Sequence, residues 1–411
     1  MLTNINWPYY YFIFARVIGL LSKPFILWFL LTSEQNVASE DFSQFYLILG
    51  SFFMLLSVPV HSNFYRNFYN KESRNWFNLA RLYREYLVNI TTHVAMVLLP
   101  FMIISPFFIT DKLLLTLFII FFLIEKIFDE IQRHMQFEKD FTVWSNLFLI
   151  KNTAPVFFII FLVFLENNSL FLGFLLFSIA LTSLLLSRHI DRRLFKIFPL
   201  LCASIYTRMR RYLVEFKREY LKKYLFGLFN ANAHQIDKWM YYFFDLKAKL
   251  AEIMLVGQIG NAMTIGSSYA TVSGRRADFV NNCKNIKDIF SGMKTFIVSS
   301  ILFIFGIAVI YSGAYQFAQI QISTIFLTLF AYFFFSLSQP LLEYVFWNVS
   351  DKHKLLIDIF YFLFFIALLF LISNFVNDIS LAIAIDFFIY QLMRLLSFLF
   401  IASRLLKIKA C

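Results

Sequence analysis

Long apolar runs recur along the whole chain, separated by short polar segments. Each run holds about 20 residues, enough for an α-helix to cross the ~30 Å hydrocarbon core of a bilayer. Helices satisfy all their backbone hydrogen bonds internally, as lipid requires. The pattern predicts an all-α, polytopic membrane protein with about twelve transmembrane helices, at 8–32, 43–61, 88–109, 112–128, 143–165, 168–187, 224–244, 249–273, 295–313, 322–347, 355–374 and 379–403.

A polar and basic stretch divides these helices into two sets of six. It predicts an N-terminal lobe at 1–187, a cytoplasmic or interfacial connection at 188–223 and a C-terminal lobe at 224–411. The connection mixes bulky apolar residues with cations, as does an interfacial helix on anionic lipid. Attraction to the membrane surface is the preferred interpretation of these cations, and binding of a lipid substrate is the alternative.

The positions of Lys and Arg give a separate test of topology, because cationic loops stay on the cytoplasmic side. With twelve helices and both termini inside, the cytoplasmic loops hold 29 of the 37 Lys and Arg residues. The opposite loops hold three, namely Lys112, Lys247 and Lys249. This segregation predicts a multi-pass protein with cytoplasmic N and C termini.

The composition is typical of a membrane protein and argues against nucleic acid as a partner. Hydrophobic residues make up 60% of the chain and charged residues 15%, with a mean hydropathy of +0.69 and a net charge of +12. Because the cations lie in short loops between apolar runs, orientation in the membrane explains them better than nucleic-acid binding. Cys202, Cys283 and Cys411 all fall in predicted cytoplasmic segments, so we expect free thiols. The first apolar run lacks the marks of a cleaved signal peptide and is predicted to be retained as a helix.

Charged residues within the first predicted helix are the first candidates for a binding site. Charge at membrane depth costs at least ~2.5 kcal/mol, so such residues usually face a cavity or a partner. Arg16, Gly19 and Lys23 are spaced i, i+3, i+7, which places both cations on one helical face with a small residue between them. Two cations on one face indicate an anionic ligand, although Arg16 is close enough to the helix end to reach the headgroups instead.

The seventh predicted helix is the least apolar and carries a second polar face. Asn230, His234, Asp237 and Tyr241 follow one another at helical spacing, and Lys238 is adjacent. We interpret this face as part of a water-filled cavity, with mutual pairing at a helix interface as the alternative. Asp237 or His234 in such a place is a candidate for taking up a coupling proton.

Further charges at membrane depth lie in the fifth and twelfth predicted helices. Lys151 stands beside Asn152, and Asp386 lies eight residues before Arg394 on the same face, where the two either offset one another or act in function. Four more polar residues are expected to be accessible to water near helix ends or to form a neutral interhelical hydrogen bond: Glu252, Glu343, Asp358 and His93.

The sequence lacks the motifs of several other functional classes. It contains no metal-ligand spacing, phosphate-cradling glycine loop, nucleotide-binding domain or hydrolase nucleophile with its base. We therefore expect no metal, no cofactor and no ATPase of its own. The predicted outer loops are about a dozen residues or fewer, which argues against an external catalytic domain.

Over its whole length the chain resembles the oligosaccharide flippases, the O-antigen and polysaccharide branch of the multidrug/oligosaccharidyl-lipid/polysaccharide exporter superfamily. The resemblance rests on the two sets of six helices, on the cations of the first helix, and on three segments. These segments are ASEDFSQFYLILGSF, HSNFYRNFYNKESRN and NANAHQIDKWMYYFFDLKAKLAEIMLVGQIG. The segment VSGRRADF departs from the family pattern, because it lacks the proline that often follows the eighth helix.

The resemblance implies two six-helix lobes around a central cavity that opens alternately to each side of a bacterial inner membrane. It implies transport of an undecaprenyl-diphosphate-linked oligosaccharide, a partnership with membrane lipids and with other polysaccharide-assembly proteins, and coupling to H⁺ or Na⁺. The implied substrate-binding residues are Arg16, Lys23, Lys151, Lys238, Asn230 and His234. The implied ion-coupling residues are Asp237 and Asp386.

Two other functions stay open at this point. A drug or small-solute exporter of the same superfamily accepts organic cations, and the cations at depth argue against it. An O-antigen polymerase or ligase also has many helices and handles the same lipid-linked sugar, but it needs a substantial outer loop with catalytic arginines. A purely structural membrane subunit leaves the charges of the first and seventh helices unexplained.

Overall fold

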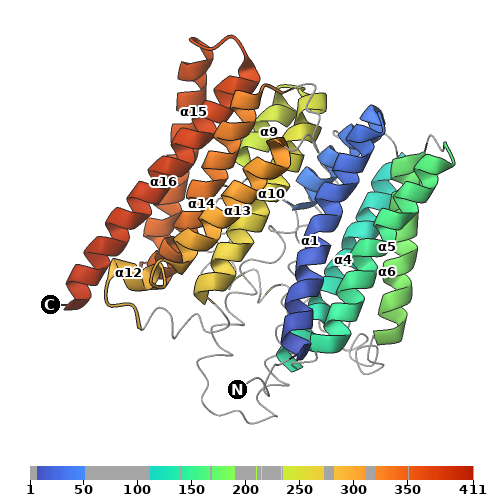
Figure 1. Ribbon diagram of the computed structural model, residues 1–411, viewed down its shortest axis with the longest axis horizontal. Helices are drawn as coiled ribbons and strands as arrows, with labels where there is room; N and C mark the ends of the chain where they lie inside the picture. The colour runs from blue at the N-terminus through green and yellow to red at the C-terminus, as the bar shows by residue number, and fades with distance from the viewer. Residues whose placement is uncertain are drawn as a thin grey trace. The chain divides into compact units, whose positions relative to one another are not determined.

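Every regular element that the structure describes is an α-helix, which confirms the all-α class (Figure 1). The structure is a computed structural model. It describes residues 7–50, 112–138, 141–166, 169–189, 210, 214, 233, 235–272, 282–311, 320–349 and 351–410.

The chain forms two compact units. Unit 1 comprises Met1–Ile26 and Ile48–Leu228, and unit 2 comprises Leu27–Leu47 and Phe229–Cys411. The helices that contribute to unit 1 are α1 (Trp7–Thr32, which enters unit 2 after Ile26), α4 (Lys112–Glu138), α5 (Phe141–Phe164) and α6 (Leu170–His189). Those of unit 2 are α9 (Ile236–Phe243), α10 (Lys247–Val272), α12 (Ile286–Ile289), α13 (Lys294–Tyr311), α14 (Ile322–Asn348), α15 (Asp351–Ser373) and α16 (Ile379–Ala410).

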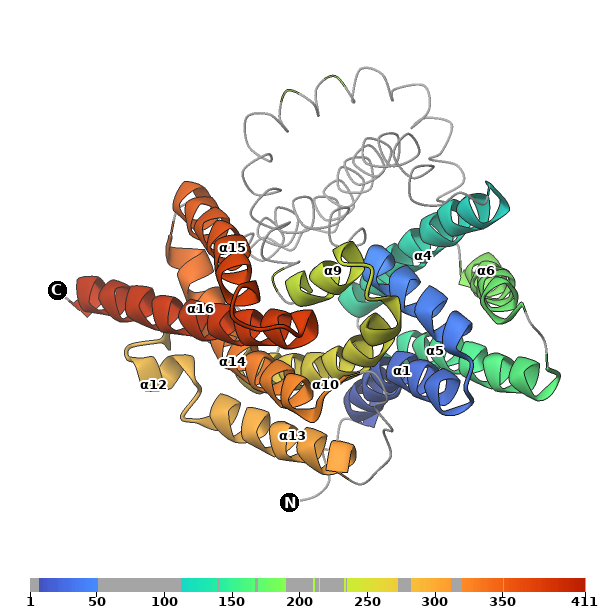
Figure 2. The ribbon, with the colours of Figure 1, turned by 90° about the horizontal axis from the view of Figure 1, so that it is seen from above.

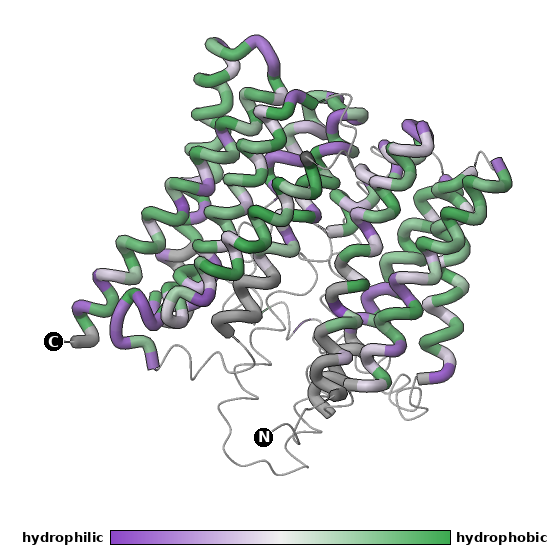
Figure 3. Tube along the Cα trace, in the orientation of Figure 1, coloured by the Kyte–Doolittle hydropathy of each residue, from purple (hydrophilic) through white to green (hydrophobic). Residues whose placement is uncertain are grey.

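Six of the described helices are long and apolar enough to cross a membrane, so the chain is a membrane protein. Hydrophobic residues cover most of their length, and hydrophilic residues gather at turns such as the one between α15 and α16 (Figure 3). Each of the six falls on a predicted apolar run: Phe14–Thr32, Thr142–Phe164, Leu170–Arg188, Ile322–Val345, Leu355–Ser373 and Ile379–Ile408.

The remaining predicted spans are not established as membrane crossings. The run at 88–109, most of the run at 43–61 and the first part of the run at 224–244 lie outside the described residues. Helices α4, α10 and α13 occupy three other runs, but they are too polar or too short to qualify by length and composition. Twelve crossings in two lobes around a cavity therefore remain a prediction.

Helix α4 is longer than its apolar run predicts. The sequence predicts a helix at 112–128, whereas α4 continues from Lys112 to Glu138. Phe128, at the end of the predicted run, is 1% exposed and packs with Leu147 of α5 and Leu185 of α6. These apolar contacts fix the end of the run against α5 and α6, and the helix continues beyond it.

Unit 2 is built around α14, which contacts α10, α13 and α16 (Figure 2). The Ser336 hydroxyl of α14 lies 2.6 Å from the Ser299 hydroxyl of α13 and donates to the Met263 carbonyl of α10 at 3.3 Å. Tyr332 of α14 meets Phe387 of α16 edge to face, with ring centroids 5.6 Å apart. Small hydroxyl side chains let these helices approach closely, and aromatic pairs fill the remaining space.

A buried ion pair joins α15 to α16 and corrects two expectations. Arg394 Nη2 lies 3.7 Å from Asp358 Oδ1, so Arg394 is paired with a neighbouring helix and not with Asp386 of its own helix. Asp358 was expected near water, yet its side chain is 4% exposed and that of Arg394 is 0% exposed. Glu252, also expected near water, is 3% exposed. Helix packing, which periodicity within one helix does not specify, determines these partners.

We expect Asp358→Asn to lower the stability of the protein by about 3–5 kcal/mol, because Arg394 is then left as a buried charge without its carboxylate. Thermal unfolding in detergent measures the change. The double variant Asp358→Asn/Arg394→Met should recover most of the loss. Asp245→Asn breaks an exposed pair with Lys247 and should change little. Equal effects of the two single substitutions would contradict this role.

Candidate functional site

Tight packing of α1 on α5 positions the first set of candidate residues. Ala15 packs against Trp144, and a Cβ added to Gly19 would lie 2.1 Å from the Phe148 ring. Gly19 therefore permits a close approach that a side chain would prevent. About one turn before Ala15 on α1, Tyr11 OH donates to Asn146 Oδ1 of α5 at 2.6 Å.

Lys23 lies about one turn after Gly19, beside an ion pair that links α5 to α4. Lys151 Nζ donates to Glu125 Oε2, and this ammonium also lies 4.4 Å from the centroid of the Phe128 ring. Lys23 is exposed and interacts electrostatically with both Glu125 and Lys151. The structure thus brings together two of the predicted cations, Lys23 and Lys151, with a carboxylate that the sequence did not single out.

Two lysines lie beside one carboxylate in this group, here called the α1–α4–α5 cluster (Lys23, Glu125 and Lys151). The Lys151 and Glu125 side chains are 16% and 12% exposed, whereas Lys23 is exposed. Lysines beside a pair that is largely shielded from water attract an anion more strongly than lysines in bulk water. Arg16, a fourth candidate, is half-buried two turns earlier on α1.

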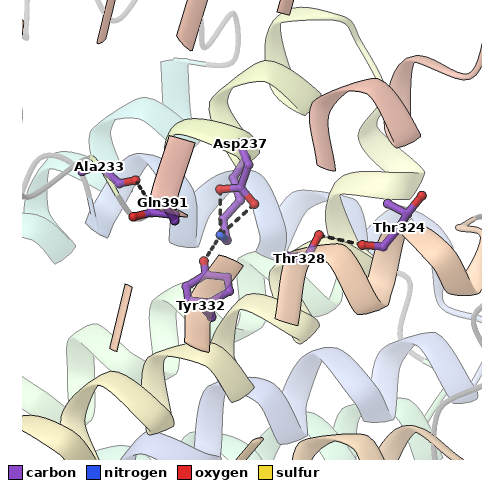
Figure 4. Close-up of polar contacts among 7 residues, drawn as sticks. Ala233, Asp237, Thr324, Thr328, Tyr332 and Gln391 are labelled. Carbon is purple, nitrogen blue, oxygen red and sulfur yellow. Dashed lines mark hydrogen bonds and ion pairs between the residues drawn. The ribbon is translucent and has the colours of Figure 1, made fainter. Parts of the chain in front are cut away.

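The second set of candidates lies in unit 2, at the start of α9 (Figure 4). Lys238 Nζ lies 3.1 and 3.3 Å from the two oxygens of Asp237 and donates to Tyr332 OH on α14. All three side chains are buried, and the ammonium lies 4.7 Å from the centroid of the Tyr332 ring. Asp237 occupies the first turn of α9, where the helix dipole favours a negative charge. Asp237 and Lys238 therefore form an ion pair within a single turn of α9.

Two glycines of α10 make room for this group. A Cβ at Gly257 would lie 2.4 Å from Lys238 Cε, and a Cβ at Gly260 would lie 2.1 Å from the Tyr332 ring. Gly257 and Gly260 are three residues apart, so they lie on one face of α10. This face lets Tyr332 and Lys238 fit between α9, α10 and α14.

The chain just before α9 is held by a side chain from α16. Gln391 Nε2 donates to the Ala233 carbonyl at 2.9 Å, and both groups are buried (Figure 4). A side-chain amide thereby satisfies a backbone oxygen at membrane depth, where water is absent. Asn230 and His234, predicted to bind substrate, lie outside the described residues.

Asp386 of α16 is a buried carboxyl group without a partner. It is 0% exposed, and neither of its oxygens has a hydrogen bond from any group in the described structure. An ionised carboxylate in such a place costs far more than its neutral acid form. The sequence identified Asp386 as unusual, and the structure shows that Arg394 does not neutralise it.

A third charged group lies where α15 turns into α16. Lys249 Nζ is 2.8 Å from Ser380 Oγ and 3.4 Å from Asp378 Oδ1, and Tyr241 OH donates to the Ser380 carbonyl at 3.1 Å. Partial burial favours the protonated form of Asp378, but hydrogen bonds from Ser380 and the charge of Lys249 outweigh it and lower the pKa of Asp378. These contacts tie the ends of α9 and α10 to the start of α16.

The sequence pattern did not single out Glu125, Tyr332 or the two glycines of α10. Glu125 lies near the end of its apolar run, and Tyr332 is one of many aromatic residues in its helix. The spacing of Gly257 and Gly260 was a usable signal, because small residues three or four apart mark close helix contacts in membranes. In the described parts of the chain, no three His, Cys, Asp or Glu residues are grouped as metal ligands.

No protein-family model, no curated protein and no solved structure matches the chain. The sequence and geometry of the chain alone therefore carry the functional argument.

We expect Gly260→Ala to destabilise the protein by about 1–3 kcal/mol, because the added methyl group displaces the buried Tyr332 ring. The matched control is Gly173→Ala, whose methyl group meets only the flexible end of Leu162. That control should be neutral or slightly stabilising, since Ala favours helix over Gly. Thermal unfolding in detergent compares them, and an unchanged midpoint for Gly260→Ala would refute the steric argument.

Asp378 should make stability depend on pH in the acidic range. Because its pKa is lower in the folded state, its contribution is present above the unfolded-state value of about 3.9 and is lost as pH falls through the folded value. We expect Asp378→Asn to unfold at a lower temperature than the unsubstituted protein at neutral pH, with the gap closing on acidification. In a Lys249→Met background the gap should be smaller. A gap that widens towards low pH would show that the sign is wrong.

Proposed function

We propose that this protein is a transporter that flips an oligosaccharide, linked to undecaprenyl diphosphate, across the bacterial inner membrane by alternating access. The observation that carries the proposal is that two lysines of long apolar helices, Lys23 of α1 and Lys151 of α5, lie together beside Glu125. A diphosphate is the anionic part of such a substrate, and lysines in a poorly hydrated site attract it strongly.

The α1–α4–α5 cluster suits an anion that binds and leaves. Lys23 is exposed, so a diphosphate reaches it without disrupting packing, and Lys151 is oriented by Glu125. Glu125 also moderates the positive charge, which keeps the ligand from binding too tightly to be released. Arg16, on the same helix as Lys23, is positioned to contact the same headgroup one or two turns away.

Unit 2 supplies candidates for ion coupling in this proposal. Asp386 gains or loses a charge without disturbing any hydrogen bond of the described structure, so its occupancy by H⁺ or Na⁺ is free to follow a gradient. Asp237 is already paired with Lys238, and its role is to hold that lysine beside Tyr332 until substrate or ion competes for it. Lys238 meets a phosphate only when this pairing opens.

The two alternatives predict different behaviour. A drug exporter binds organic cations, which Lys23 and Lys151 of the α1–α4–α5 cluster repel. A polymerase or ligase lengthens or transfers the sugar chain and changes its covalent structure. Cells lacking a flippase retain single repeat units on the cytoplasmic face, whereas cells lacking the enzyme still expose them on the periplasmic face.

A reconstituted flipping assay tests the proposal directly. The full-length protein is placed in liposomes with a fluorescent sugar linked to undecaprenyl diphosphate, and a membrane-impermeant quencher reports the rate of exchange between leaflets. We expect Lys23→Ala to slow the initial rate about tenfold or more, since a hydrogen bond to a charged group contributes ~1.5–3 kcal/mol.

Two further variants make the assay specific. Lys112→Ala removes an exposed lysine from the first residue of α4 and should leave the rate unchanged. Lys151→Met/Glu125→Gln removes the buried pair together, so the fold is kept while the site is lost. Full flipping by Lys23→Ala and by this double variant would eliminate the α1–α4–α5 cluster as the binding site.

A further inference from the structure

A groove of about 490 Å³ runs between α15 and α16 and belongs to neither charged site. This volume lies within the range of about 300–1,000 Å³ typical of sites that hold one small molecule. The groove is lined by Leu356, Ile357, Phe360, Tyr361, Leu396, Ser397, Phe400 and Ile401.

The lining of the groove favours a hydrocarbon occupant. Its two polar side chains, Tyr361 and Ser397, are hydrogen-bonded to each other and leave no vacant partner for a sugar. Phe360 and Phe400 are 62% and 60% exposed, so each helix contributes a large apolar side chain that lines the groove and reaches its surface. In a membrane-spanning pair of helices, such a groove is filled by lipid tails and not by water.

The depth of the groove follows from the length of α16. Its 32 residues span about 48 Å, longer than the ~30 Å hydrocarbon core, so one end extends into the headgroup layer. Arg404 lies 25 residues after Ile379, or about 38 Å along the helix. Thus with Ile379 at one surface of the core, the groove at 396–401 lies near the other surface and Arg404 lies at headgroup level.

Two cations stand at this end of the groove. Arg404 packs on a groove residue, with its Cζ 5.4 Å from the centroid of the Phe400 ring, and Lys407 follows about one turn later. Both are exposed, and the described structure gives neither of them an acidic partner. An anionic lipid phosphate at the mouth of the groove would therefore complement the charge of Arg404 and Lys407. Each cation should raise the affinity for such a lipid about fivefold.

We propose that this groove binds an anionic phospholipid of the surrounding bilayer, with one acyl chain between α15 and α16 and the phosphate on Arg404 and Lys407. The groove spans six residues of each helix, about 8 Å of helix rise, which matches a segment of one acyl chain better than a long polyprenyl chain. The site is separate from the α1–α4–α5 cluster and does not depend on the proposed transport function. A bound phospholipid would contact both α15 and α16 next to the Asp358–Arg394 ion pair and so stabilise their packing.

Photolabelling of the full-length protein in nanodiscs tests this site. The probe is phosphatidylglycerol with a photoreactive group on its acyl chain, and phosphatidylcholine with the same group is the neutral comparison. After irradiation, mass spectrometry should find the phosphatidylglycerol label on peptides containing 356–361 and 396–401. Labelling of these peptides by the phosphatidylcholine probe should be at least about tenfold weaker, because its headgroup carries no net charge.

Substitutions distinguish binding of the lipid headgroup from binding of the acyl chain. Arg404→Ala/Lys407→Ala should reduce phosphatidylglycerol labelling about 25-fold, and Lys287→Ala, at an exposed lysine of α12, should not. Leu396→Trp fills the groove from an exposed position and should block labelling with the cations intact, whereas Phe370→Trp, elsewhere on α15, should not.

Three outcomes would overturn the proposal. In the first, both phospholipid probes label the groove equally, and Arg404→Ala/Lys407→Ala does not change this labelling. That result would mean ordinary contact with the bilayer. Another is labelling by a photoreactive undecaprenyl phosphate in preference to phosphatidylglycerol, which would assign the groove to the lipid carrier. The third is undiminished labelling of Leu396→Trp, which remains decisive even if the charge variant fails to fold.

Discussion

The high free-energy cost of a charge in lipid governs how this protein is built. Several ionised side chains of the described helices meet an opposite charge from the same or a neighbouring helix. Ion pairs between helices therefore stabilise helix packing in both units, α4 with α5 and α15 with α16. Separating these helices would leave a charge in lipid, which solvates charge poorly. The pairs are Lys151–Glu125, Lys238–Asp237 and Arg394–Asp358.

Against that background the exceptions carry the functional argument. In the α1–α4–α5 cluster two lysines lie beside one carboxylate, and the buried oxygens of Asp386 have no hydrogen bond in the described structure. Stability alone favours neither arrangement, because both cost free energy that an apolar side chain would not. In the proposed flippase, a substrate anion meets the two lysines and an exchangeable ion occupies Asp386.

The sequence predicted the helical class, the six helices that are long and apolar enough to cross a membrane, and most of the charges within them, because length and hydropathy depend on each segment alone. It did not predict the ion-pair partners of these charges. Pairing of Arg394 with Asp386 on its own helix was one of two possibilities, whereas packing of α15 on α16 supplies Asp358. Glu125 was overlooked because α4 continues past its apolar run, and Tyr332 gains significance only beside Gly260 of another helix. Such contacts arise between segments distant in the chain, so no spacing rule within one helix reveals them.

The adjacency of Asp237 and Lys238 has a consequence for motion. Because the ammonium and its counter-ion belong to the same turn of α9, they travel together when that helix shifts against α14. Such a shift breaks the hydrogen bond from Lys238 to Tyr332, while the ammonium keeps its counter-ion. A short helix that carries its own neutralising acid thus rearranges within the bilayer at a much smaller electrostatic cost than Arg394, whose release from Asp358 would separate two charges in lipid.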